Sequence, residues 1–291
     1  MKIGVLTSLF PSEVRPFEGI FAERRWRGMA ERGHDVTIVQ PTPRVPWPLA
    51  SLAPRRFGDL AGRQRIEQRG PLEVRRPRYL HATGFSGFSA GRFAAAGWAE
   101  LLAAGKPDVV VCDYAWPAAE VVSLARAAGT PVVISGRGSD VLAVAEDKNL
   151  RPRLAADLAA AGAWIAVSDD LVASMSELAT EGGLAPGAGS SALVPNGVDG
   201  ELFQPVDEAR RTELRAELGW AEGEVIVLVV GHLIPRKDPL LALSAFRSFL
   251  RQLNQKNSGA PPDARLIFVG EGELEGRLRA AIAEGPQGAP G

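Results

Sequence analysis

The sequence has few of the side chains that form disulfides and metal centres. Its one cysteine, Cys112, has no intramolecular partner, and its three histidines are scattered without helical spacing. A zinc site of the usual kind needs several such ligands close together. We therefore expect no disulfide and no metal site, and the near absence of thiols fits the reducing cytoplasm.

Long hydrophobic runs and an excess of one charge are also missing. The strongest apolar run, Val225 to Val230, has the length of a strand, whereas a membrane-spanning helix needs about 20 apolar residues. Basic and acidic side chains number 33 and 34, and the net charge of -1 gives no field that attracts a polyanion. The sequence therefore predicts neither a transmembrane helix nor a nucleic-acid partner.

What is present is an alternation of short β-branched runs with longer helical patterns. In the first two thirds of the chain we expect buried strands at 3–7, 36–40, 109–112, 132–135 and 164–167. Helical stretches before three of them end at Gly33, Gly105 and Gly129, where a helix closes in a left-handed turn. This order predicts βαβ units and a parallel sheet with helices on both faces.

A second α/β unit follows Pro195-Asn196-Gly197. Its patterns predict strands at 225–230 and 266–269, and helices at about 208–218, 239–253 and 273–283. Two strands cannot normally bury both faces of a sheet. We therefore expect an α/β fold with two Rossmann-like domains, residues 1–192 and 193–291. The second would be incomplete, and would either rest on the first or continue beyond Gly291.

Four loops follow predicted strands and are candidate sites, because ligands of open parallel sheets bind at the carboxyl ends of the strands. The first, Ser8 to Gly19, lacks the glycines of a dinucleotide fingerprint. Gly19, at the start of a helix, could still admit a phosphate to the backbone N–H groups. The alternative is an ordinary turn glycine.

The second loop is Gly136-Arg137-Gly138-Ser139-Asp140. Its carboxylate, Asp140, can accept hydrogen bonds from sugar hydroxyls, and Arg137 can pair with a phosphate. Alternatively, Ser139 and Asp140 only cap the following turn.

The third loop runs from Gly231 to Pro239 and has Arg236 and Lys237 at the start of a helix. Two cations beside a helix N-terminus predict an anion site, and fixed positive charge favours the departure of a nucleoside diphosphate from a sugar. The alternative is a pair of surface charges. The fourth loop, Gly270-Glu271-Gly272-Glu273, has half the pattern of a glycine-rich loop, which alone is a weak indication of a binding site.

The segment from Arg44 to Tyr79 is rich in arginine. It has nine arginines against three acidic residues, together with Trp47 and Phe57. A peripheral contact of residues 44–80 with an anionic membrane surface is one hypothesis, and a solvated loop is the other.

Taken in order, these segments resemble the family 4 retaining glycosyltransferases, whose GT-B architecture has two Rossmann-like domains facing across a cleft. The resemblance spans nearly the whole chain and is carried by Gly19 to Val36, Arg137 to Asp140, Val194 to Phe203, Gly231 to Lys237 and Phe268 to Gly272. The Pro-Asn-Gly-Val-Asp string and the lysine loop are the most specific. The loops after the first and fourth strands look most like enzymes of cell-surface polysaccharide synthesis, such as the teichuronic-acid type.

The resemblance implies a nucleotide-sugar donor as substrate, no cofactor or metal, and a glycan or lipid-linked acceptor on the side of residues 1–192. Asp140 and Lys237 would be the catalytic groups. The donor contacts would be Gly19, Arg137, Arg236, Lys237, Gly270 and Glu271.

Two departures from the family pattern bear on activity. The sequence has His232 where the family usually has arginine, and two later glutamates of the family have no counterpart before Gly291. We therefore expect a truncated chain with weak or no turnover. The alternatives are a sugar-nucleotide epimerase of similar architecture, for which no cluster of proton-transfer groups is visible, and a non-catalytic module that binds a glycan or a partner.

Overall fold

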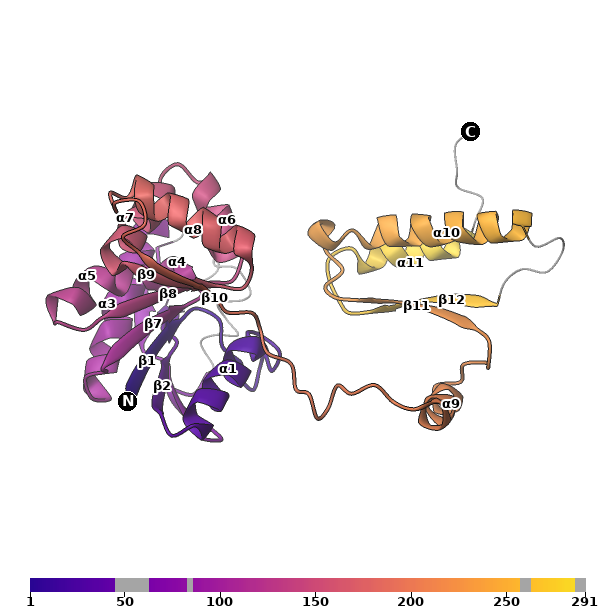
Figure 1. Cartoon of the computed structure of the whole chain (residues 1–291), viewed down its shortest axis with the longest axis horizontal. Helices are drawn as coiled ribbons and strands as arrows, with labels where there is room; N and C mark the ends of the chain where they lie inside the picture. The colour runs from indigo at the N-terminus through magenta and orange to yellow at the C-terminus, as the bar shows by residue number, and fades with distance from the viewer. Residues whose placement is uncertain (45–62, 83–85, 257–262, 286–291) are drawn as a thin grey trace. The chain divides into compact units, whose positions relative to one another are not determined.

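The computed structural model describes residues 1–44, 63–82, 86–256 and 263–285. The chain forms two compact units, Met1–Asp199 and Gly200–Gly291, which Figure 1 shows with their elements labelled. The first unit reaches beyond residue 192, because the backbone N–H of Val194 donates to Ala166 O at 2.8 Å and Arg25 binds the carbonyl of Val194 at 3.0 Å.

The first unit is built on one eight-stranded sheet, in the order β10-β9-β8-β7-β1-β2-β5-β4. Its neighbouring strands are parallel except for the antiparallel pair of β4 and β5. A separate two-stranded sheet pairs β3 (Thr42–Arg44) with β6 (Arg78–Leu80). The strands of the large sheet are β1 (Lys2–Thr7), β2 (Asp35–Val39), β4 (Ile66–Arg69), β5 (Leu72–Arg75), β7 (Val109–Asp113), β8 (Val132–Gly136), β9 (Ala163–Ala166) and β10 (Ser190–Leu193).

Helices cover both faces of this sheet. On one face, Ile3 and Val5 of β1 pack in an apolar cluster with Trp26 of α1 (Ile20–Glu31). On the other face, Leu6 packs in a larger cluster with side chains of several helices. These helices are α3 (Ser86–Ala103), α4 (Ala115–Ala118), α5 (Val122–Ala127), α6 (Ser139–Glu146), α7 (Arg151–Ala161) and α8 (Asp169–Glu181), with a 3-10 turn, η2 (Ala119–Val121).

The predicted α/β pattern is confirmed in this unit. The five expected strands are β1, β2, β7, β8 and β9, each within one residue of the expected ends. The three glycines expected in left-handed turns, Gly33, Gly105 and Gly129, have φ of 87°, 109° and 71°. The hairpin of β4 and β5 and the strand β10 were not predicted.

The second unit has a two-stranded parallel sheet with helices on one face. It comprises α9 (Glu208–Glu217), β11 (Val225–Val230), η3 (Pro235–Lys237), α10 (Pro239–Lys256), β12 (Ala264–Val269) and α11 (Glu275–Ala283). Figure 1 shows α10 and α11 side by side on the same side of β11 and β12. Its small core is formed by Leu233, Leu243 and Leu278, with Leu266 and Phe268 packed against them.

The other face of this small sheet stays exposed within the unit. Leu228 and Val230 of β11 are 52% and 69% exposed, and Val269, which pairs with Val230, is 50% exposed. No helix among the described residues is long and apolar enough to cross a membrane.

Candidate functional site

The β1–α1 loop, residues 8–19, ends in a glycine that the loop itself requires. Gly19 has a φ of 71°, and a Cβ at this position would lie 2.8 Å from the carbonyl oxygen of Leu9. Both the left-handed backbone and the close approach exclude a larger residue. The missing side chain of Gly19 thus makes room for the loop's own backbone, which accounts for the glycine without a ligand.

Asp140 lies at the start of α6 with its carboxylate turned into the fold. It is 3% exposed and accepts hydrogen bonds from the backbone N–H groups of Ala115, at 2.6 Å, and Arg137, at 2.9 Å. Burial raises the pKa of Asp140, and the backbone donors partly oppose that rise. The carboxylate therefore ties the β8–α6 loop to the start of α4. It does not cap the turn that follows, because the N-cap of α6 is Gly138, which has no side-chain cap.

The guanidinium group of Arg137 is held by neighbouring side chains of the first unit. Its Nη2 and Nε lie 2.7 and 2.8 Å from Oδ1 of Asp113, and the side chains of this ion pair are 3% and 1% exposed. Its Nη1 donates to Oδ1 of Asn196 at 2.5 Å, and its guanidinium lies 4.9 Å from the ring centroid of Phe21. The charge of Arg137 is thus largely balanced by Asp113.

A second arginine, Arg25 of α1, lies beside this ion pair. It donates to Val194 O at 3.0 Å, to Pro195 O at 3.4 Å and to Ser135 Oγ at 3.4 Å. Burial lowers the pKa of Arg25, the positive charge of Arg137 lowers it further, and Asp113 opposes both effects. Two guanidinium groups therefore share one carboxylate at the carboxyl edge of the sheet, with a local excess of positive charge.

Asp113, the centre of this cluster, was not among the predicted site residues. Its Oδ2 also accepts from Trp26 Nε1 at 2.6 Å. The expected strand ended at Cys112, yet the rule that selected the other loops, a polar residue directly after a buried strand, applies to Asp113 as well. Tyr114, next in the chain, lies with its hydroxyl 2.9 Å from Ser139 Oγ.

In the second unit, the loops after β11 and β12 lie backbone against backbone. The N–H of Leu233 donates to Glu271 O at 2.9 Å, and the N–H of Leu274 donates to Leu233 O at 2.9 Å. A side chain on Gly270 would collide with the carbonyl oxygen of Gly231, and both glycines have φ above 150°. The two glycines therefore allow the third and fourth predicted loops to come together.

The third loop presents its cations to solvent. Arg236 and Lys237 form the end of η3, both are exposed, and neither side chain has a hydrogen-bond or ion-pair partner among the described residues. The next residue, Asp238, has a φ of 39° and accepts from the backbone N–H of Leu241 at 3.1 Å. Asp238 thus caps α10 and places a carboxylate at the helix end that was expected to serve an anion.

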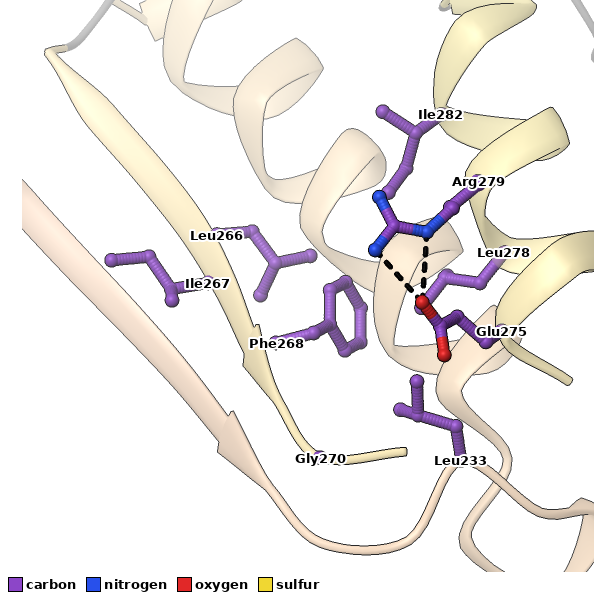
Figure 2. Close-up of a pocket in the computed structure, with 9 residues that line it drawn as sticks. All are labelled: Leu233, Leu266, Ile267, Phe268, Gly270, Glu275, Leu278, Arg279 and Ile282. Carbon is purple, nitrogen blue, oxygen red and sulfur yellow. Dashed lines mark hydrogen bonds and ion pairs between the residues drawn. The ribbon is translucent and has the colours of Figure 1, made fainter. Parts of the chain in front are cut away.

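An apolar hollow of about 300 Å³ lies between β12 and α11, as Figure 2 shows. Its one cation, Arg279, is paired with Glu275 at 2.8 Å, so its lining offers no free positive charge to a phosphate. Its lining residues are Leu233, Leu266, Ile267, Phe268, Gly270, Glu275, Leu278, Arg279 and Ile282.

The predicted site residues thus fall into two groups, one in each unit. Arg137 and Asp140 lie together at the carboxyl edge of the first sheet. Arg236, Lys237, Gly270 and Glu271 lie on the joined loops of the second unit. In the described part of the chain, no three His, Cys, Asp or Glu side chains are grouped as metal ligands would be.

Comparison with known sequences identifies the family. The model of the glycosyl transferase 4-like domain matches residues 19–182, more than half of the chain. One relative is the teichuronic acid biosynthesis glycosyltransferase TuaC of Bacillus subtilis strain 168. It is 26% identical over 288 residues, which cover 96% of this chain and 67% of TuaC. A D-inositol 3-phosphate glycosyltransferase of Segniliparus rotundus is 38% identical over 84 residues, 29% of this chain and 16% of its own length.

Solved structures with similar folds have two-domain GT-B architecture. Anabaena Alr3699/HepE, in complex with UDP and glucose, matches with a TM-score of 0.59 and 16% identity over 99% of this chain and 68% of its own. An α,α-trehalose-phosphate synthase (UDP-forming) from Burkholderia xenovorans, in complex with glucose-6-phosphate, matches with a TM-score of 0.61 and 14% identity. The match covers 99% of this chain and 70% of the synthase. The chain spans about two thirds of the length of these proteins. Its fold is that of the GT-B proteins, and the chain belongs to the glycosyl transferase 4-like family.

Proposed function

We propose that this protein is a glycosyltransferase that moves a sugar from a nucleotide-sugar donor to a glycan or lipid-linked acceptor, with retention of anomeric configuration. Its family membership supports the reaction class. The main support for a donor site is the pair Arg236 and Lys237, which follows the carboxyl end of β11. Both side chains are exposed and have no hydrogen-bond or ion-pair partner among the described residues.

The reaction needs positive charge where the donor breaks. When the bond between the sugar and the diphosphate breaks, negative charge grows on the leaving oxygen, and fixed cations beside it lower the barrier. Lys237 and Arg236 would supply this charge. Gly270 lets the adjoining loop lie against the loop that has these cations, because its missing side chain leaves room for the carbonyl oxygen of Gly231. Correct alignment of the acceptor hydroxyl is a separate requirement.

The relatives indicate which donors and products to test first. TuaC is named for teichuronic acid biosynthesis, and Alr3699/HepE has been solved with UDP and glucose. We therefore propose a uridine-nucleotide sugar as donor and a surface polysaccharide, or its lipid-linked precursor, as product. The enzyme would work in the cytoplasm.

Release of nucleoside diphosphate from a panel of sugar nucleotides, with and without lipid-linked glycan acceptors, tests the proposal. Lys237→Met should lower the rate by about 100-fold, as expected when a group that stabilises the leaving charge is lost. Lys148→Met is the matched control, because Lys148 is also exposed and has no hydrogen-bond or ion-pair partner among the described residues. This control should keep the full rate.

Other outcomes would assign a different function. Formation of an epimer from the donor alone would indicate a sugar-nucleotide epimerase. Binding of a glycan without any response to nucleotides would indicate a non-catalytic module. Equal rates for Lys237→Met and the unchanged protein would contradict the assigned role of the loop.

A peripheral membrane contact through residues 44–80 is a separate proposal. Residues 45–62 lie outside the described residues, and several arginines after them form ion pairs: Arg63 with Glu18, Arg69 with Glu23, Arg75 with Glu73 and Arg76 with Glu67. These ion pairs support a role for residues 63–76 in holding the first unit together, not in binding a membrane. Flotation with anionic and with neutral liposomes tests the contact, and equal recovery from both would end it.

A further inference from the structure

Two arginines of the arginine-rich segment are buried beneath the β1–α1 loop. The side chains of Arg63 and Arg76 are each 1% exposed. Between them lies Gln40, which is 2% exposed and whose Oε1 accepts from Arg63 Nη1 at 3.2 Å and from Arg76 Nε at 3.0 Å. We name these three side chains the guanidinium layer.

The guanidinium layer binds the loop at both of its ends. Near the start of the loop, Arg76 Nη2 donates to Pro11 O at 2.9 Å, and Gln40 Nε2 donates to Ser8 O at 3.3 Å. Near the end, Arg63 Nη2 donates to Glu18 Oε2 at 2.8 Å. Residues that are adjacent to β1 and residues that are adjacent to α1 are therefore held by one connected network.

Ion pairs balance the buried charges. Arg63 pairs with Glu18, and Arg76 pairs with Glu67 at 2.6 Å. Burial lowers the pKa of Arg76, and Glu67 opposes that effect. Apolar side chains of similar volume often fill such a space at equal or lower free energy, so buried ion pairs are weak evidence for stability alone. Apolar side chains, however, cannot donate hydrogen bonds to the carbonyl groups of the loop, as Arg76 does to Pro11 O.

One apolar side chain also anchors the loop. Phe10 is 0% exposed and belongs to the apolar cluster of β1 and α1, so burial fixes the start of the loop. A reciprocal pair of hydrogen bonds joins Ser12 and Arg15, at 3.2 and 3.1 Å, and closes a small turn. The side chain of Val14 in this turn is 54% exposed, and that of Phe17 is 80% exposed, so neither anchors the loop by burial. Beyond Phe10, the hydrogen bonds to Pro11 O and to the Glu18 carboxylate therefore link the loop to the guanidinium layer.

We infer that Gln40, Arg63 and Arg76 are positioning residues that hold the β1–α1 loop, and with it Gly19, in a single conformation at the carboxyl edge of the sheet. The purpose of this order, a prearranged surface for the donor, rests on the proposed function. The order itself does not, and it can be measured without any ligand.

Hydrogen exchange of the loop amides in the full chain tests the inference. Arg76→Met removes the guanidinium but keeps an unbranched side chain. The amides of Arg15 and Glu18, which are hydrogen-bonded inside the loop, should then exchange at least about tenfold faster, as expected for the loss of a hydrogen bond from a charged group. Amides of β7 and β8 should not change. Guanidinium chloride at low millimolar concentration should restore protection, whereas sodium chloride should not.

Arg75→Met is the matched control. Arg75 is the neighbouring residue and also forms ion pairs, with Glu73 at 2.7 Å and Glu100 at 3.0 Å. Among the described residues its side chain has no hydrogen bond or ion pair with the loop. Its replacement should leave loop exchange unchanged. If Arg76→Met unfolds the unit, Gln40→Met gives the second test, because it removes the donor to Ser8 O without leaving either arginine without its carboxylate.

Two results would overturn the inference. One is unchanged loop exchange in both Arg76→Met and Gln40→Met, and the other is equal acceleration in the Arg75→Met control. A loosened loop with an unchanged rate of nucleotide release would support the positioning role and overturn its stated purpose, a prearranged surface for the donor. Absence of any nucleotide release in the unchanged protein would instead refute the proposed function and leave the exchange result standing.

Discussion

At the scale of single residues, the surroundings of a charged side chain decide what it can do. The sequence predicts Arg137 as a phosphate ligand, but in the fold its guanidinium group is bound to Asp113 and Asn196. The sequence also predicts Lys237 as a phosphate ligand, and its side chain is exposed without a partner among the described residues. Sequence reasoning finds both cations and cannot rank them, because the partner Asp113 is 24 residues away from Arg137.

Loss of the Asp113 charge should destabilise the first unit. Asp113→Asn leaves Arg137 buried without a counter-ion, and breaking a buried pair in this way costs about 3–5 kcal/mol. Urea unfolding followed by tryptophan fluorescence measures the loss. Glu181→Gln is the control, since its pair with Arg151 is 47% and 43% exposed and exposed ion pairs add little to stability. Equal losses for the two variants would contradict the account.

Asp157 should make the first unit less stable as the pH rises. Burial, together with the nearby charge of Glu120, raises its pKa to about 8, while Arg153 lowers it. Because the folded pKa lies above the unfolded value of about 3.9, this contribution is complete below about pH 4 and is lost as the pH approaches 8. Between pH 5 and 8 the unchanged protein should lose on the order of 4 kcal/mol relative to Asp157→Asn.

The measurement is the free energy of unfolding in urea at several pH values. Glu146→Gln, which removes an exposed carboxylate at the end of α6, is the control and should follow the unchanged protein. Parallel curves for the unchanged protein and Asp157→Asn would contradict the raised pKa.

At the scale of elements, the end of each strand and the start of each helix set the chemistry of the loops. The start of α10 is capped by Asp238, so a carboxylate next to Lys237 already accepts a hydrogen bond from a backbone N–H group at this helix end. The sequence pattern predicted that the helix end itself attracts an anion. The cations, rather than the helix terminus, are therefore the attractive part of the proposed donor site.

Removing this negative charge while keeping the cap should strengthen anion binding. Asn caps helices about as well as Asp and tolerates a positive φ. Asp238→Asn should therefore leave the stability of the second unit unchanged and tighten UDP binding by about two- to fivefold. Titration calorimetry measures the change. Asp207→Asn, at the N-cap of α9, is the control, and an equal gain there would show that only overall charge matters.

How well an element could be predicted depended on its burial. Strands buried on both faces, such as β1 and β7, appear in the sequence as unbroken apolar runs and were expected nearly to the residue. The hairpin of β4 and β5 was missed because its strands are short and rich in charged residues, and ion pairs such as Arg69 with Glu23 hold it in place. Partners so distant in sequence give no local signal.

At the scale of the whole molecule, the family membership and the α/β architecture could be predicted from ordered motifs. The second unit has the predicted two strands, and one face of that small sheet is exposed within the unit. The ligand-binding roles of Asp140 and Gly19 stay predictions. The sequence gives no sign of their contacts within the fold, where Asp140 accepts from the backbone N–H group of Ala115 and Gly19 lies against the backbone of Leu9.

Mapping of UDP binding by backbone amide chemical shifts tests the central claim most directly. The account predicts that UDP shifts the amides of residues 231–237 and 270–272, and that Lys237→Met weakens binding whereas Lys148→Met does not. No saturable shift in these two loops, or shifts confined to other parts of the chain, would contradict the proposed donor site.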